Sequence, residues 1–320
     1  MDQRNGTLPT FFTIAGISDL PALQFPIFLL VVFIYLSTLA GNIAILLLIC
    51  LYRHLHTPMY FFLANLSILD ISSSTITLHK ILLTFVSGDK TTSLTVCLAQ
   101  IYVFLSLTSD ELVILTAMSY DRYVAVCNPL RYNVIINQEI CALLMSVCWI
   151  WGFLICLETF LELTRLTCFQ SNKINHFYCD VVPVMKISCN DTSFLEIYIL
   201  IMGLIVVVVI PFLLTLISYV FIIVSIMKIR TNTGRRKAFY TCSSHLTVVI
   251  LLYTTLICQY FRPVSGDTLE SNKFFSFFNT VAVPILNPLI YSLKNKDVKL
   301  AFKKFRCKMQ ANNKQRTRQN

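Results

Sequence analysis

Long apolar segments are the feature that most constrains how this chain can fold. A helix that crosses a bilayer needs about 20 predominantly apolar residues, and seven such segments follow one another along the 320 residues. Because lipid offers a peptide backbone no hydrogen-bond partner, segments of this kind must be helical. The seven segments lie at about residues 25–51, 58–82, 97–120, 140–161, 194–227, 238–261 and 272–293.

The sequence therefore predicts an all-α membrane protein built as a seven-transmembrane helix bundle. Its composition agrees, since 56% of the residues are hydrophobic, only 13% are charged and the mean hydropathy is +0.70. A soluble domain has about 25% charged residues. Residues 1–24 lack a basic start followed by an apolar core, so we expect the first span to act as an uncleaved signal anchor.

The distribution of basic residues predicts the orientation. With the amino terminus outside, the inner segments are residues 52–57, 121–139, 228–237 and 294–320, and they hold about 18 of the 26 Lys and Arg residues. This is the positive-inside pattern of membrane proteins. The net charge of +10 is thus a signal of topology, and nucleic acid is not an expected partner.

The tail after residue 294 is the one long polar segment of the sequence. Residues 299–305 alternate lysines with leucine and phenylalanine, which is typical of a short amphipathic helix lying on an anionic leaflet. Cys307 follows these residues, and both a palmitoylated cysteine and a free thiol fit that position.

Four of the twelve cysteines fall in segments predicted to lie outside, where disulfides can form. They are Cys97, Cys168, Cys179 and Cys189, and the sequence alone allows three pairings. His176 and Cys179 have a metal-like spacing, but an oxidised cysteine cannot be a thiolate ligand, so we expect no metal site. Asn5 and Asn190 begin outer glycosylation sequons.

Four polar residues are predicted at mid-membrane depth on four different helices. They are Asn42, Asp70, Glu111 and Asn287. Since lipid cannot hydrogen-bond them, they should meet in the bundle interior. Two neighbouring carboxylates could recruit a cation there, or the group could be a static hydrogen-bond network. Pro288 removes a backbone hydrogen bond and permits a kink in the seventh span.

Four blocks of sequence occur together in order and identify a family resemblance. They read PMYFFLANLSILD at 58–70, MSYDRYVAVCNPL at 118–130, KAFYTCSSH at 237–245 and PILNPLIYSLKN at 284–295. With these blocks the chain, from about residue 11 to residue 305, resembles the odorant receptor family of rhodopsin-like G protein-coupled receptors. The resemblance implies an extracellular amino terminus at 1–24, a seven-transmembrane receptor domain at 25–293 and a basic cytoplasmic tail at 294–320, in a multi-pass plasma membrane protein.

The resemblance also implies roles for individual residues. Arg122 would pair with Asp121 at rest and face the G protein cavity in the active state. The polar group would surround a sodium ion near Asp70 and Glu111, and the disulfides would be Cys97–Cys179 and Cys168–Cys189. The remaining activation residues are Tyr219, His245, Asn287, Pro288 and Tyr291. His245 is expected to be a structural hydrogen-bonder to the third helix.

The ligand pocket combines helical spacing with the resemblance. Spacing places residues of the third and sixth spans on common faces, and the resemblance adds residues of the fifth and seventh. The expected pocket residues are Phe104, Leu105, Thr108, Met202, Val206, Tyr253, Leu256, Ile257, Tyr260, Phe277 and Thr280. Such a mostly apolar cavity suits a small, poorly water-soluble ligand. The side chain of Asp110 is expected to point toward the fourth span rather than into the ligand pocket.

These observations predict an odorant receptor that binds a small ligand and activates a stimulatory G protein, which raises cyclic AMP. The nearest alternative is a non-olfactory rhodopsin-like receptor, for instance one for amines. Against it, Phe104 stands at the third-helix position where the resemblance to amine receptors would imply an aspartate. A transporter would show internal repeats with paired broken helices, and none is visible in the sequence. A membrane enzyme is not expected, because no catalytic constellation surrounds the intramembrane acids.

Overall fold

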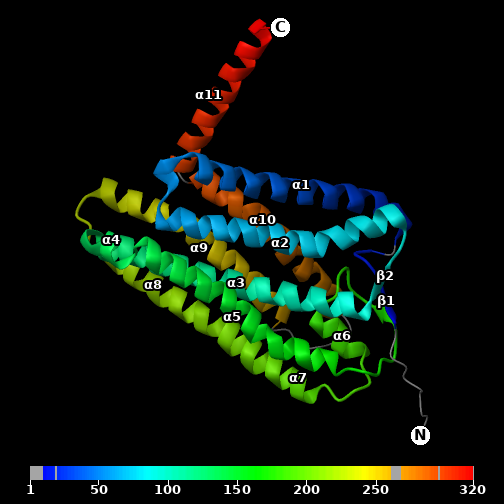
Figure 1. The fold of residues 1–320 in the computed structure, drawn as a ribbon. Coiled ribbons are helices and arrows are strands. Elements are labelled where there is room, and N and C mark those ends of the chain that lie inside the picture. Colours follow the sequence, from blue (N-terminus) through cyan, green and yellow to red (C-terminus); the bar gives the residue numbers. More distant parts are fainter. Residues whose placement is uncertain (1–9, 19, 261–267, 295, 320) are drawn as a thin grey trace.

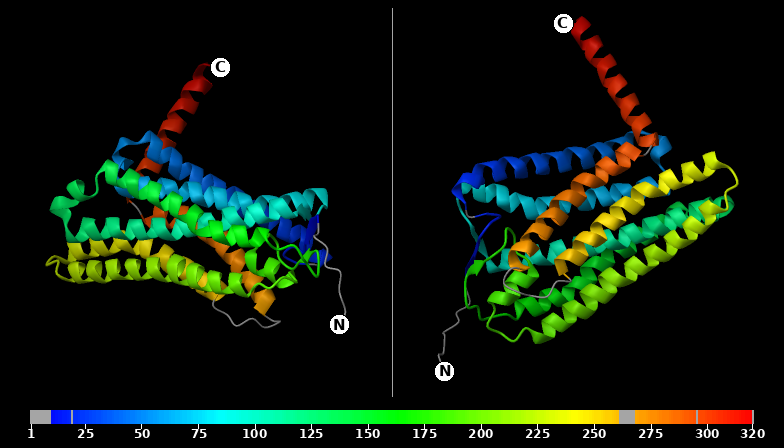
Figure 2. Two further views of the ribbon diagram at one scale, coloured as in Figure 1. Left: turned by 60° about the horizontal axis from the view of Figure 1, so that its bottom comes forward. Right: turned by 180° about the vertical axis from the view of Figure 1, so that it is seen from behind.

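The computed structural model describes residues 10–18, 20–260, 268–294 and 296–319. Long helices lie side by side in a bundle, and one further helix leaves it at an angle (Figures 1 and 2). Within the described residues, six helices are long and apolar enough to cross a membrane, and His245–Cys258 is a shorter apolar stretch. Together these helices form the predicted seven-helix arrangement.

The seven spans match the predicted segments to within seven residues at each end. In chain order they are α1 (Pro21–Leu51), α2 (Pro58–Ser87), α3 (Leu94–Cys127), α5 (Gln138–Thr164), the continuous run α7 (Ser193–Tyr198), η3 (Ile199–Val209) and α8 (Ile210–Met227), then α9 (Asn232–Tyr260) and α10 (Thr268–Lys294). Short elements connect them, namely η1 (Arg53–Leu55), η2 (Pro129–Arg131), α4 (Tyr132–Ile135) and α6 (Val181–Ile187).

Local sequence signals explain where several spans begin and end. Pro21 and Pro58 occupy the first turns of α1 and α2, where the missing N–H costs nothing. Gly88 ends α2 with a φ of 72°, a conformation that glycine adopts readily. Asn137 caps α5, its side-chain oxygen accepting a hydrogen bond of 2.8 Å from the Ile140 N–H.

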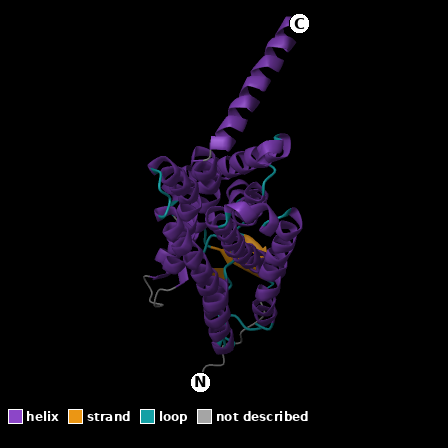
Figure 3. Cartoon of the chain, turned by 90° about the vertical axis from the view of Figure 1, so that its left-hand side faces the viewer, coloured by secondary structure: helices purple, strands orange, loops and turns teal. Residues whose placement is uncertain are grey.

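A small sheet lies at one end of the bundle (Figure 1) and was not predicted; its strands are coloured orange in Figure 3. It consists of β1 (Phe11–Ile14), β2 (Thr91–Ser93) and β3 (Lys173–Ile174) in the order β2-β1-β3, with β1 antiparallel to β2 and parallel to β3. Strands this short leave no periodic pattern in the sequence. We call this the sheet end of the bundle and the opposite end, where α3 finishes, the Arg122 end.

The central helix of the bundle is α3. Its apolar window is 61% buried, whereas only 6% of the window in Ser193–Met227 is buried. The main cluster of buried side chains joins α3 to α2, α5 and α9. The fifth span is therefore peripheral, and its many exposed leucines and isoleucines face the lipid.

The helix after the seventh span is longer than the short amphipathic helix predicted from residues 299–305. It is α11 (Lys296–Gln319), and it runs away from the bundle across the direction of the spans (Figure 1). Val298 and Ala301 are buried and Phe305 packs against the core, so the apolar side of its first turns anchors it.

The contact between α3 and α5 depends on Gly152. A Cβ atom built at this glycine would lie 1.9 Å from Asp110 Oδ1 and 2.5 Å from the Ser106 carbonyl oxygen. The side chain of Asp110 therefore points toward the fourth span, as the sequence predicts, and it fills the space that the glycine leaves.

We expect Gly152→Ala to lower the free energy of unfolding by about 1–3 kcal/mol, because overpacking displaces Asp110 or the helix itself. Gly203→Ala is the matched control, since its nearest neighbour would lie 3.7 Å away. The check is the melting temperature of each purified variant. Equal melting temperatures for the two variants would contradict the tight contact.

Candidate functional site

The ion pair at the end of α3 is held by a third residue. Arg122 Nε donates to Asp121 Oδ2 at 2.8 Å, and its terminal nitrogen forms a salt bridge with the same oxygen. Tyr132 in α4 donates a hydrogen bond of 2.6 Å to Asp121 Oδ1. Burial, and then the charge of Asp121, raise the pKa of the Tyr132 phenol, which keeps it a donor. Tyr132 thereby holds in place the carboxylate with which Arg122 forms its ion pair.

A second polar contact joins the fifth and sixth spans beside this pair. The Tyr219 hydroxyl lies 2.7 Å from His245 Nδ1, with the two rings stacked, and 3.3 Å from the Cys242 carbonyl oxygen. His245 Nε2 faces the backbone of Leu115 in α3 without meeting hydrogen-bond geometry. His245 is therefore hydrogen-bonded to Tyr219 of the fifth span and also interacts with the backbone of the third helix, the partner that the sequence predicts.

The polar residues at mid-membrane depth meet in the interior. Asn287 Nδ2 donates to both carboxylate oxygens of Asp70 at 3.1 and 3.0 Å, which joins α2 to α10. Glu111 lies within electrostatic range of Asp70. Asn42 Nδ2 binds the carbonyl oxygens of Thr38 and Pro284 at 3.1 and 3.0 Å, and so joins α1 to α10.

Three buried side-chain oxygens of these four residues have no hydrogen-bond partner among the described residues. They are Asn42 Oδ1, Glu111 Oε1 and Asn287 Oδ1. Carboxylate and amide oxygens are ligands that hard cations prefer. The donor set of Asp70, Glu111 and Asn287 therefore fits the sodium ion that the resemblance implies.

The expected pocket residues fall into neighbouring buried clusters. Phe104 and Phe277 pack in one cluster together with Phe177 and Tyr178, and Thr280 is buried. Tyr253 and Leu256 belong to the main cluster, while Leu105 packs with the group at the sheet end. Thr108 is half-buried.

The structure corrects the placement of Ile257. Its side chain is 45% exposed, and Ile250 and Thr254, which share its face of α9, are exposed as well. The reason is geometric, since positions 250, 254 and 257 follow helical spacing along the flank of α9 next to Tyr253, at the edge of the buried face. The side chains of Tyr260 and Tyr291 lie outside the described residues.

Met202 and Val206 lie in a π-helical segment that the sequence did not predict. The segment η3 covers eleven residues of the fifth span, and both side chains are half-buried in it. A π-helix turns each side chain less than an α-helix does, and such segments are frequent at functional sites. Pro211, just after the segment, cannot donate a helical hydrogen bond, which favours the change of pitch.

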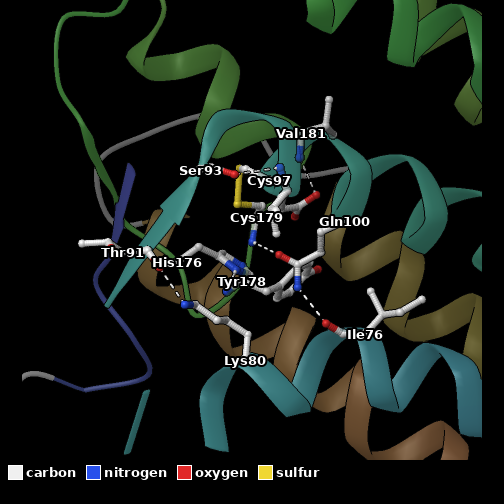
Figure 4. The surroundings of a disulfide bond; sticks show 12 residues. Ile76, Lys80, Thr91, Ser93, Cys97, Gln100, His176, Tyr178, Cys179 and Val181 are labelled. Carbon is white, nitrogen blue, oxygen red and sulfur yellow. Dashed lines mark hydrogen bonds between the residues drawn. A yellow bond between two sulfur atoms is a disulfide. The ribbon is translucent and has the colours of Figure 1, made fainter. Parts of the chain in front are cut away.

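The sheet end carries a roof of loops fastened by two disulfides. Cys97 pairs with Cys179 and Cys168 with Cys189, which are the pairs implied by the resemblance. Gln100 also holds the roof, because its Oε1 accepts from the Cys179 N–H at 3.1 Å and its Nε2 donates to the Ile76 carbonyl at 2.8 Å (Figure 4). The sequence offered no signal for this glutamine.

Two buried ionisable residues lie in the roof near Cys179. Burial raises the pKa of Asp180 to about 6, and its Oδ1 accepts a hydrogen bond of 2.7 Å from the Val181 N–H. Burial and the charge of Lys273 lower the pKa of His176 to about 3. The ring of His176 stacks on Phe177 with centroids 4.6 Å apart, so the histidine acts as an aromatic core residue.

Of the two asparagines predicted to be glycosylated, the structure describes only Asn190. The side-chain oxygen of Asn190 accepts hydrogen bonds from the Thr167 and Cys168 N–H groups at 3.0 and 2.9 Å, so it also fastens the roof. Asn5 lies outside the described residues.

Comparison with known proteins decides the family. The olfactory receptor family model matches residues 31–309. The chain belongs to the olfactory receptor family. It is 43% identical to mouse olfactory receptor 8G50, over 95% of this chain and 97% of the relative. It is 42% identical to human olfactory receptor 8B3 over 98% and 99%, and 40% identical to human olfactory receptor 8J3 over 95% and 96%.

Membership makes this olfactory receptor a multi-pass membrane protein of the G protein-coupled class and not an enzyme. The transporter alternative is set aside on the same ground. Sequence reasoning also missed Tyr132 as a partner of Asp121, because it reaches Asp121 through a turn and not through helical spacing.

We expect Asp180→Asn to stabilise the receptor at pH 7.5 by up to about 3 kcal/mol. The folded pKa of Asp180 lies above its unfolded value, so its contribution to stability is complete below about pH 4 and is lost as the pH rises through about 6. Asparagine keeps the acceptor for Val181 and cannot ionise. Melting temperatures between pH 4 and pH 8 should therefore differ from wild type most at high pH.

Asp191→Asn is the control for this prediction. Hydrogen bonds from Ser193 lower the pKa of Asp191, which is exposed in the same loop, so removing its charge should not stabilise the receptor at pH 7.5. A constant difference between Asp180→Asn and wild type across the pH range would contradict the assignment. The pH-dependent contribution of His176 to stability is the same in the variant and in wild type, so it cancels in the difference between their melting temperatures.

Proposed function

We propose that this receptor binds a small, mostly apolar odorant beneath its roof and activates a stimulatory G protein at the Arg122 end, which raises cyclic AMP. The observation that carries the proposal is the Tyr132–Asp121–Arg122 arrangement, a buried charge held ready at the end of the central helix. Charge at such depth is expensive and is typical of functional sites.

The proposal includes an orientation in the plasma membrane. The sheet end faces outward, because both disulfides lie there and disulfides form in oxidising compartments. The Arg122 end faces the cytoplasm, because the segments at that end hold most of the basic residues.

The hydroxyl groups of the pocket narrow the ligand class. Thr108 Oγ1 donates to the Phe104 carbonyl at 2.9 Å, and Thr280 Oγ1 donates to the Ser276 carbonyl at 2.9 Å. A hydroxyl that already donates can only accept from a ligand. We therefore favour an apolar odorant that carries one donor, such as an alcohol or a phenol.

Activation is a shift between two arrangements of the helices. The ligand must bind the active arrangement more tightly than the resting one. In the resting arrangement α9 is tied to α8 by His245 and Tyr219, and to α10 by a 3.2 Å hydrogen bond from Thr255 to Asn279. Breaking the first of these while keeping the second lets the Arg122 end of α9 move outward.

Exposed apolar residues next to Arg122 suit contact with a G protein. Leu130 is 100% exposed and Val134 is 78% exposed, on the turn that also carries Tyr132. This turn lies beyond the end of α3, where lipid does not cover it. Exposed apolar side chains rimmed by polar residues are typical of protein interaction surfaces.

We expect Arg122→Ala to abolish the odorant response, with a loss of at least about tenfold in cyclic AMP signal, as removal of a buried charge partner costs several kcal/mol. Tyr132→Phe should raise basal signalling about fivefold, because losing one hydrogen bond costs about 1 kcal/mol. The measurement is a cyclic AMP reporter in cells that express the stimulatory G protein, across an odorant panel, with surface staining.

Arg131→Ala is the matched control, since Arg131 is exposed on the same turn. A response that survives Arg122→Ala at equal surface level would make Arg122 structural. A response to amines alone would favour the non-olfactory alternative. Activation of an inhibitory G protein only would overturn the proposed coupling.

We also propose that Asp70, Glu111 and Asn287 hold a sodium ion in the resting state. Replacing sodium by choline should then raise basal signalling of the purified receptor in a nucleotide-exchange assay, because the ion stabilises the resting arrangement. Asp70→Asn should abolish this difference. Identical basal signalling of wild type in both salts would contradict the site.

A further inference from the structure

An apolar groove lies on the outer surface of the bundle, between α1, α10 and α11. Its volume is about 410 Å³, within the range of small-molecule sites. Of the residues that line it, all in the described part of the chain, Ser37 alone has a polar side chain. The residues that shape its walls include Phe33, Gly41 and Leu48 of α1, Pro288 and Leu289 of α10 and Phe302 of α11.

The floor of the groove is formed by a close approach of two helices. A Cβ atom at Gly41 would lie 3.0 Å from Pro288 Cγ, so α1 and α10 meet here because residue 41 has no side chain. Phe302 closes the end nearest the Arg122 end, where α11 crosses the two spans. Among the described helices, α11 is the one that leaves the bundle across the direction of the spans (Figure 2).

The dimensions of the groove match an acyl chain. Phe33 and Leu48 are fifteen residues apart on α1, which is about 22 Å at 1.5 Å per residue. The hydrocarbon core of a bilayer is about 30 Å thick. The groove thus runs from the surface at the Arg122 end to beyond the middle of the membrane, which is somewhat more than the depth of one leaflet, about 15 Å.

Basic residues stand where the headgroup of such a lipid would lie. Lys299 and Arg306 are exposed and are spaced three before and four after Phe302, so they are its neighbours on the helix surface. Lys304 projects from the opposite flank by the same spacing. The combination of an apolar groove and adjacent cations fits an anionic lipid.

We propose that this groove binds one acyl chain of an anionic phospholipid, with its headgroup against Lys299 and Arg306. Only the assignment to the cytoplasmic leaflet rests on the orientation proposed above. A sterol fits less well, since the one polar side chain of the groove, Ser37, lies in mid-membrane and not at the surface where a sterol hydroxyl resides.

The bound chain contacts the same turn that enters the polar cluster. Pro288 and Leu289 line the groove, while the preceding Asn287 holds Asp70. The lipid therefore braces the point of α10 at which proline has removed a helical hydrogen bond.

The test uses the full-length receptor in nanodiscs of phosphatidylcholine that contain a phosphatidylserine with a photoreactive acyl chain. After illumination, labelled peptides are mapped by mass spectrometry. Labelling of the groove residues should exceed that by the matching phosphatidylcholine probe by at least about fivefold, the contribution of one basic residue near a headgroup. Both leaflets carry the same lipids, so the result does not depend on orientation or on G protein coupling.

Two pairs of variants decide the outcome. Ala44→Phe fills the groove and should remove the labelling, whereas Ile43→Phe, on the exposed face beside it, should not. The double variant Lys299→Gln, Arg306→Gln should lose the preference for phosphatidylserine, and Lys304→Gln should keep it.

Labelling that is spread over all spans, or that both phenylalanine variants reduce alike, would overturn the proposal. So would a photoreactive sterol that labels the groove and is not displaced by phosphatidylserine. If Ala44→Phe fails to fold, the lysine and arginine variants at the surface carry the test by themselves.

Discussion

The absence of hydrogen-bond partners in lipid is the constraint on which this structure depends. It forces the backbone into helices and turns polar side chains toward one another. In this receptor Asp70 of α2 and Asn287 of α10 satisfy each other. The acids and the arginine of α3 likewise turn inward, which explains why α3 is the central helix while the apolar fifth span lies at the periphery.

The same constraint creates elements that can switch. Apolar contacts between helices are interchangeable, but a buried hydrogen bond has few alternatives, so it defines discrete arrangements. The sixth span is tied to its neighbours by the His245–Tyr219 contact toward the Arg122 end and by the Thr255–Asn279 bond nearer the sheet end. Losing one and keeping the other produces a pivot and not a uniform displacement.

The sequence predicted the spans well, because length and hydropathy decide them. It also predicted that Asp70 and Asn287 meet, since polar groups at membrane depth find hydrogen-bond partners only in one another. It could not find Tyr132, Gln100 or the strands, because these contacts follow from how turns and loops fold back in three dimensions. The prediction that Ile257 lines the pocket was wrong for a related reason. Helical spacing shows which residues share a face of the helix, but only packing against the neighbouring helices decides which edge of that face is buried.

The seventh span is where the internal and external surroundings of the receptor meet. Asn287 contributes to the polar cluster, and Pro288, the next residue, lines the groove that faces lipid. A proline leaves the helix with one hydrogen bond fewer at that point, so its shape is set by what packs on either side. The proposed cation in the cluster and the proposed lipid in the groove would both act on this turn of α10, so by linkage we expect each to change the affinity for the other.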